Sequence, residues 1–144
     1  MRYPIAFSTA VLFIAGCASS PVTTTDAQAV SSSAIYAPEV FIQAPNKAQI
    51  TLIRDSSFGG QCALGIYLDG KLVAGIKREE KVVMYVSPGT HIVGAGPNPN
   101  GVGVCKMFAE KLRRETEITP SLDRPVKLRL AMLSGAISIT PTAF

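Results

Sequence analysis

The chain has 144 residues, of which 47% are hydrophobic and 17% are charged. This length suits one domain, and the apolar composition excludes a disordered chain. The formal net charge of +4 is too small to indicate a nucleic-acid-binding protein, and one histidine with three cysteines leaves little material for a metal site.

The first 16 residues have the succession of segments that is typical of a secretory signal peptide. Met1 and Arg2 give a short positive start, and residues 4–15 form an uncharged run that is too short for a transmembrane helix. The run ends in Ile14-Ala15-Gly16-Cys17, which resembles the lipobox of bacterial lipoproteins. We therefore expect lipid on the thiol of Cys17. An ordinary signal peptide with a chance cysteine is the alternative.

The residues around the lipid site predict a location. Cleavage before Cys17 removes Arg2, which leaves 13 basic and 10 acidic side chains and a net charge of +3. Several buried acyl chains give effectively permanent anchoring. Ala18 and Ser19 follow the lipid site, where an Asp would resemble an inner-membrane retention signal. We therefore expect the protein to be anchored by its lipid at the periplasmic face of a bacterial outer membrane.

Residues 17–46 are predicted to be the lipidated cysteine and a flexible tether. The Ser/Thr/Pro-rich stretches 19–25 and 31–33 contain little that forms a core. A flexible chain of this length has a root-mean-square reach of about 30 Å. The apolar run 40–42 is the exception, and we expect it to dock on the domain that follows.

From residue 47 onward the sequence predicts a β-sandwich domain, 47–144. Apolar residues alternate with others in several short segments: 48–52, 62–68, 72–76, 81–86, 91–95, 126–132 and 136–140. Asp69-Gly70 is a strong two-residue hairpin signal, and Ser87–Thr90 contains the Pro-Gly pair of a turn. Residues 104–112 fit a short helix or a strand. The fold expected is all-β, a small antiparallel sandwich or partly open barrel of seven or eight strands.

Two segments resemble a known family. Residues 67–75 and 85–91 are similar to the "vyvDGk" hairpin and the "v.PG.H" strand of a bacterial lipoprotein family known only as a domain of unknown function, and PEGA-type β-sandwich modules share the second turn. The matching residues are Arg54, Asp69, Gly70, Pro88, Gly89 and His91. The resemblance covers residues 48–95, and the strand expected later is replaced by residues 125–129. The resemblance implies a β-sandwich located in the cell envelope. The family has no established chemical activity that could be expected of this chain.

Cys62 and Cys105 remain once Cys17 is lipidated, an even pair in an oxidising compartment. A bridge between them would close a loop of about 44 residues and stabilise the domain by about 4 kcal/mol. Two separate buried thiols are the alternative.

The sequence contains no recognisable catalytic constellation. His91 has no nucleophile motif around it, no metal-ligand spacing occurs, and the glycines of 94–103 do not meet a phosphate-binding pattern. We expect no enzyme activity, no cofactor and no metal. Glu115 and Glu117 are typical of a solvated edge strand.

Two sets of residues are candidate contacts. The first is a loop set for a protein partner: Phe58, Pro97, Asn98 and Asn100. The second is a basic set for acidic groups: Lys77, Arg78, Lys81, Arg113 and Arg114.

The sequence favours a non-enzymatic binding or structural module of the envelope, held at the membrane by its lipid and contacting an envelope protein. Peptidoglycan or lipopolysaccharide binding through the basic set is the alternative. A third class, an enzyme or a lysozyme inhibitor, has less support, because an inhibitor of a basic enzyme should be acidic.

Overall fold

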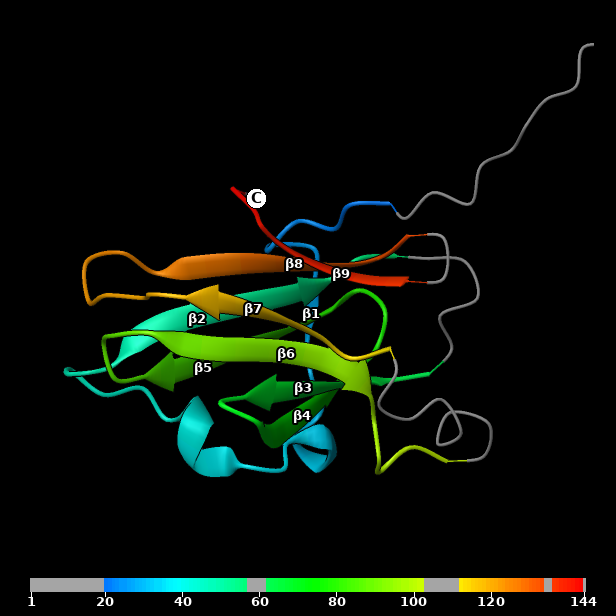
Figure 1. Ribbon diagram of the computed structural model, residues 1–144, viewed down its shortest axis with the longest axis horizontal. Coiled ribbons are helices and arrows are strands. Elements are labelled where there is room, and N and C mark those ends of the chain that lie inside the picture. The colour runs from blue at the N-terminus through cyan, green and yellow to red at the C-terminus, as the bar shows by residue number, and fades with distance from the viewer. Residues whose placement is uncertain (1–19, 57–61, 103–111, 134–135, 144) are drawn as a thin grey trace, which may run out of the picture.

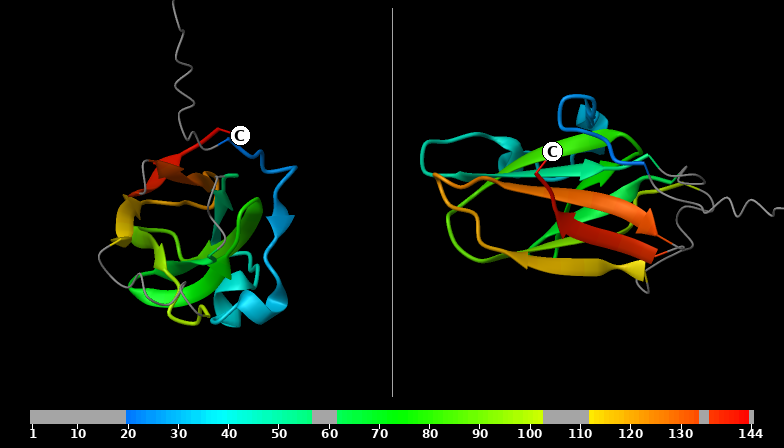
Figure 2. Two further views of the ribbon diagram at one scale, coloured as in Figure 1. Left: turned by 90° about the vertical axis from the view of Figure 1, so that its right-hand side faces the viewer. Right: turned by 90° about the horizontal axis from the view of Figure 1, so that it is seen from above.

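Nine strands form two sheets that pack face to face in the computed structural model, which describes residues 20–56, 62–102, 112–133 and 136–143 (Figures 1 and 2). The strands are β1 (Gln28–Ala29), β2 (Ala48–Arg54), β3 (Leu64–Leu68), β4 (Lys71–Ile76), β5 (Glu80–Val86), β6 (His91–Pro97), β7 (Arg114–Ile118), β8 (Val126–Leu133) and β9 (Ala136–Pro141). One sheet has the order β1-β5-β2-β8-β9 and the other β4-β3-β6-β7. The predicted sandwich is confirmed.

The core lies between the sheets because alternate residues of each strand face inward. In β3, Leu64, Ile66 and Leu68 are buried while Tyr67 is half-buried, as the alternation predicts. In β8, Leu128 and Leu130 are buried, and they belong to the same hydrophobic core cluster as Leu64, Ile66 and Leu68.

The hairpin predicted at Asp69-Gly70 and the turn predicted at Ser87–Thr90 are also confirmed. Asp69 and Gly70 join β3 to β4 with φ angles of 49° and 83°, and a two-residue turn of type I′ needs positive φ at both positions. Gly89 has a φ of 133° in the turn between β5 and β6. The stretch 104–112, where a helix or a strand was expected, lies outside the described residues except for Leu112.

Two pairings depart from the antiparallel arrangement expected. β2 is antiparallel to β5 but parallel to β8, with Ile50 opposite Val126. β1 is parallel to β5, with Gln28 opposite Glu80. A parallel pair needs a long connection, and 71 intervening positions separate β2 from β8 here.

The segment expected to be a flexible tether lies along the sandwich over residues 20–46, and this expectation is corrected. It contains β1 and two 3-10 turns, η1 (Ser32–Ala34) and η2 (Pro38–Phe41). The Tyr36 amide donates to the Val73 carbonyl at 2.9 Å. Figure 2, left, shows this blue-to-cyan segment running down one side of the molecule. Before η2, the segment is held by backbone hydrogen bonds, by side chains of the sandwich such as Asp55 and Lys81, and by small buried residues such as Ala37, so its own composition gives little sign of order.

The expected docking of residues 40–42 is confirmed in part. Val40 and Phe41 pack against the core cluster, whereas Ile42 is 62% exposed. Both packed side chains belong to η2, which ends at Phe41.

Strand registers bring the connections together at two ends of the sandwich. The near end, on the right of Figure 1, contains Ser20–Val22, Arg54–Ser56, Cys62 and Lys77–Glu79. The far end, on the left, contains loops 42–47, 69–70, 87–90 and 119–125.

Candidate functional site

The far end contains a network of polar side chains and turns that connects several loops. Ala48 pairs with Val86 and His91 pairs with Ile118, so the loops beside these residues lie at the same end. The Gly89 amide donates to the Pro120 carbonyl at 3.2 Å, which joins two of the loops directly. Ile42 and Leu122 (59% exposed) are two of the three exposed large apolar residues among those described, and both lie here.

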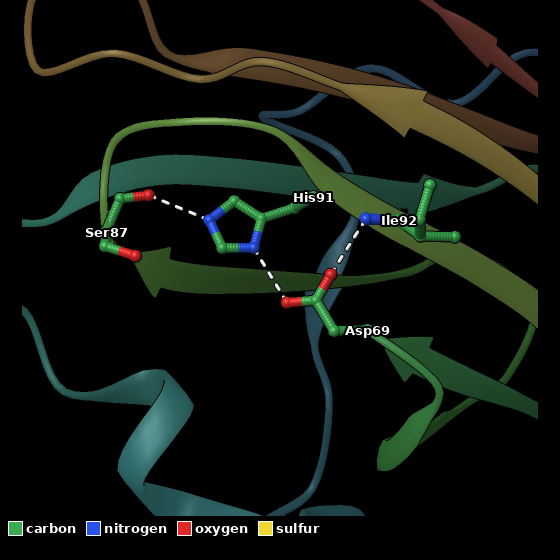
Figure 3. A network of polar contacts seen from close by, with 4 residues as sticks. All are labelled: Asp69, Ser87, His91 and Ile92. Carbon is green, nitrogen blue, oxygen red and sulfur yellow. Dashed lines mark hydrogen bonds and ion pairs between the residues drawn. The ribbon is translucent and has the colours of Figure 1, made fainter.

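A polar clasp formed by Asp69 and His91 organises this end (Figure 3). The Asp69 Oδ2 atom lies 2.7 Å from His91 Nδ1, and His91 Nε2 lies 2.8 Å from the Ser87 carbonyl oxygen. The Ile92 amide donates to Asp69 Oδ1 at 2.9 Å, and the Asp69 amide donates back to the Ile92 carbonyl. The clasp therefore ties the β3–β4 turn to both ends of the β5–β6 turn.

The two acceptors around His91 favour the charged ring. A carbonyl only accepts, so Nε2 carries a proton, and an ionised Asp69 requires a second proton on Nδ1. Burial of the ring opposes the charge, but the bonds to Asp69 and Ser87 outweigh it and raise the pKa of His91. Partial burial also opposes the Asp69 charge, but the Ile92 amide and His91 outweigh it and lower the pKa of Asp69.

Because both ring nitrogens of His91 are engaged, the clasp acts as a structural tie in this geometry. The sequence reading singled out Asp69 and His91 separately, as a turn residue and an isolated histidine. The resemblance to the "DG" and "PG.H" pattern was the available signal, and the structure brings the two motif residues into contact.

The remaining charged residue of that pattern, Arg54, is buried at the near end. It is 2% exposed, and its Nη1 donates to the carbonyls of Cys62 at 2.7 Å and Ile76 at 2.9 Å. Burial, followed by the neighbouring charge of Arg78, lowers the pKa of Arg54 to about 10. This guanidinium joins the end of β2 to the second sheet.

Several residues of interest in the sequence lie outside the described residues: Cys17, Phe58 and Cys105. Cys62 is described and is half-buried. Its pairing with Cys105 stays a prediction.

The predicted loop contacts do not form one exposed surface. Asn98 is only 3% exposed; its Nδ2 donates to the Tyr36 hydroxyl at 3.0 Å, and its Oδ1 accepts the Asn100 amide. A contact role for the Asn98 side chain is therefore corrected, because this side chain shapes the turn from within. The Pro97 carbonyl accepts the Tyr67 hydroxyl at 3.1 Å, and Asn100 is exposed.

The five basic candidates are spread over both sheets. Lys77 and Arg78 are exposed in the β4–β5 turn, while the Lys81 ammonium donates to the Thr24 carbonyl at 2.5 Å. The strands β4 and β7 are opposite edges of one sheet, so the arginines beside β7 lie away from that turn.

Arg113 and Arg114, just before and at the start of β7, have local partners. The guanidinium of Arg113 lies 3.9 Å from the ring centroid of Tyr67 and 2.7 Å from Glu115. Arg114 donates to the Arg113 carbonyl at 3.0 Å. The expectation that Glu115 and Glu117 lie on a solvated edge strand is confirmed, because both are exposed on β7.

Among the described residues, no cluster of three or more histidine, cysteine, aspartate or glutamate side chains is placed to hold a metal ion. Within the same residues, no helix has the length and apolar character to cross a membrane.

The chain matches no protein-family model, and searches of curated proteins and of solved structures find no similar protein.

Proposed function

We propose that this protein is a lipid-anchored module of the bacterial outer membrane that faces the periplasm and binds an envelope protein without catalysing a reaction. The sequence Ile14-Ala15-Gly16-Cys17 carries the proposal, because it supplies small residues before a single cysteine at the end of a short apolar run. Lipid on Cys17 is the attachment to the membrane.

The far end is the proposed contact surface. The Asp69–His91 clasp ties turns 69–70 and 87–90 together, and the bond from the Gly89 amide to the Pro120 carbonyl adds loop 119–125. Exposed apolar residues on a fixed framework suit protein recognition, since little conformational freedom is lost on binding. Ile42 and Leu122 supply such side chains here.

Lipid anchoring is tested by expressing the chain with its own N-terminus in a bacterium that has an outer membrane. The intact mass should correspond to a chain that begins at a lipid-modified Cys17, in the outer-membrane fraction. Cys17→Ser should lose both the lipid mass and the fractionation. An unmodified chain, or the same fractionation for Cys17→Ser, would contradict the anchoring.

Partner binding is tested by photocrosslinking in cells, with a photoreactive residue in place of Ile42 or Leu122. The matched control carries it in place of Gln28, which is exposed on β1, away from the far end. One protein should recur at the two far-end positions and be missing for Gln28 and for Cys17→Ser. The same mixture from all three positions would contradict the proposed surface. Salt-sensitive sedimentation with cell wall would instead indicate binding of acidic envelope polymers.

A further inference from the structure

The first described residues are bonded to the near end of the sandwich. Ser20 and Ser56 exchange two backbone hydrogen bonds, at 2.8 and 3.1 Å. Two residues later, the Val22 amide donates to Oδ1 of Asp55 at 3.2 Å. Asp55 is 1% exposed and its other oxygen accepts from Arg129 Nε at 2.5 Å, so this attachment point is itself buried and charge-paired.

The residues after Val22 are also bonded to the sandwich, so they do not form a free linker between this attachment and the domain. Ala27 is buried, the Gln28 and Val30 amides donate to the carbonyls of Glu79 and Lys81, and Ile35 forms a bridge with Ala74. The chain that composition suggests as a spacer is thus part of the folded unit. Its described length cannot add reach between a lipid and the sandwich while these bonds persist.

Only three peptide steps separate Cys17 from Ser20, and a fully extended chain covers about 11 Å in three residues. We propose that the lipid on Cys17 holds the near end of the sandwich against the membrane surface, with the far end directed away from it. The inference rests on the proposed lipid anchoring and adds an orientation to it. The near end would contact the bilayer leaflet that holds the lipid chains of Cys17.

The turn that contains Lys77 then lies on the membrane side. The Glu79 amide donates to the Arg54 carbonyl at 3.0 Å, and Arg54 precedes the Ser20–Ser56 bridge by two residues. The charges of this turn are equal in number, with Lys77 and Arg78 followed by Glu79 and Glu80. Covalent attachment, more than attraction to anionic headgroups, therefore sets the orientation.

The length of the strands separates the two ends. Eight residues of β8 span about 27 Å at the usual rise per residue. Loop 119–125 precedes β8 at the far end. With the near end against the membrane, residues of this loop would lie about 27 Å farther from the membrane surface than residues of the near end. A probe that senses only the membrane surface can distinguish the two ends.

The test uses the lipidated full-length protein in vesicles of phosphatidylethanolamine and phosphatidylglycerol with a nitroxide quencher on the headgroups. A fluorescent unnatural residue replaces Lys77 or Arg124, two exposed cationic turn residues at opposite ends. Quenching should be severalfold stronger at position 77. Equal quenching in protein that floats with the vesicles would overturn the orientation alone, whereas protein that fails to float would overturn the lipid anchoring.

A second variant tests whether the short connection causes the orientation. Insertion of about 12 Gly/Ser residues between Ser19 and Ser20 adds a root-mean-square reach of about 20 Å. The difference in quenching should then disappear while flotation is retained. The same insertion at the C-terminus is the control and should leave the difference intact. A difference that survives the first insertion would overturn the tethering explanation.

Discussion

The carboxylate of Asp69 lies 2.7 Å from the imidazole of His91, although 22 positions separate them in the sequence. The contact joins the turn of the β3–β4 hairpin to the β5–β6 turn, which connects the two sheets. Because the Ile92 amide also donates to Asp69, the tie involves backbone as well as side chains. We assign it the role of keeping the far-end loops in register with each other.

The clasp should make stability depend on pH. The pKa of His91 is raised in the folded state. The charged imidazole therefore contributes fully to the free energy of unfolding below about pH 6.5, and this contribution is lost as the pH rises through the folded-state pKa. The lowered pKa of Asp69 means that its contribution is present above about pH 3.8 and is lost as the pH falls. The clasp should therefore stabilise most between these values, by about 1 kcal/mol since the carboxylate is half exposed.

Urea denaturation of the wild type and His91→Gln at pH 5.5 and pH 8.5 measures this contribution. The variant should lose more stability at pH 5.5 than at pH 8.5. Thr90→Ala, an exposed neighbour without this contact, is the control and should show no such pH difference. An equal loss for His91→Gln at both pH values would show that the charged ring is not the stabilising form.

Arg54→Met should destabilise the domain by about 3 kcal/mol, because two carbonyls lose a charged donor inside the protein. Arg54→Lys should recover part of the loss, since an ammonium restores a positive donor. Chemical denaturation gives the values, with the exposed Arg124→Met as a control expected to change stability by less than about 0.5 kcal/mol. Full stability of Arg54→Met would show that this tie between sheets is dispensable.

Lys81→Met should loosen the N-terminal segment without unfolding the core, because it removes the ammonium bonded to the Thr24 carbonyl. Hydrogen exchange at Gln28 and Val30 should accelerate about tenfold, as expected for loss of a charge-assisted hydrogen bond. Lys127→Met on β8 is the matched control. Unchanged exchange at both amides would mean that the segment is held by its other contacts alone.

Gly75→Ala should destabilise by about 1–3 kcal/mol, since an added Cβ would lie 2.6 Å from Asn98 Nδ2 and 2.9 Å from the Tyr36 hydroxyl. The effect should shrink when Asn98→Ala is already present, because the nearer of the two colliding atoms is then gone. Gly70→Asn is the comparison, with open space and a side chain that tolerates positive φ. Additive losses in the double variant would contradict the proposed collision.

Peptide mapping without reduction should recover Cys62 linked to Cys105. Replacing both by serine should then cost about 4 kcal/mol, because the bridge closes a loop of about 44 residues in the unfolded chain. The wild type under reducing conditions is the matched comparison and should lose a similar amount. Linkage of Cys62 to any other cysteine would contradict the predicted pairing.

Local features of the fold were predictable from the sequence. The alternation of Leu64, Ile66 and Leu68 identified the buried face of β3, and Asp69-Gly70 identified its turn. Both depend on residues close together in the chain, where side-chain period and backbone preference decide the outcome.

Long-range relationships were not predictable in the same way. The parallel pairing of β2 with β8 has no local signature, and neither does the approach of His91 to Asp69. The N-terminal segment was misjudged because backbone bonds, as between Tyr36 and Val73, leave no pattern in side-chain composition.

The docked N-terminal segment also acts as edge protection. It covers β5 through β1 and covers β4 through Ile35 and Tyr36, and each is otherwise an outer strand of its sheet. Bare outer strands offer rows of amides and carbonyls to strands of other molecules. A stretch rich in serine, threonine and alanine, whose composition predicts only a flexible tether, therefore protects this side of the sandwich from edge-to-edge association.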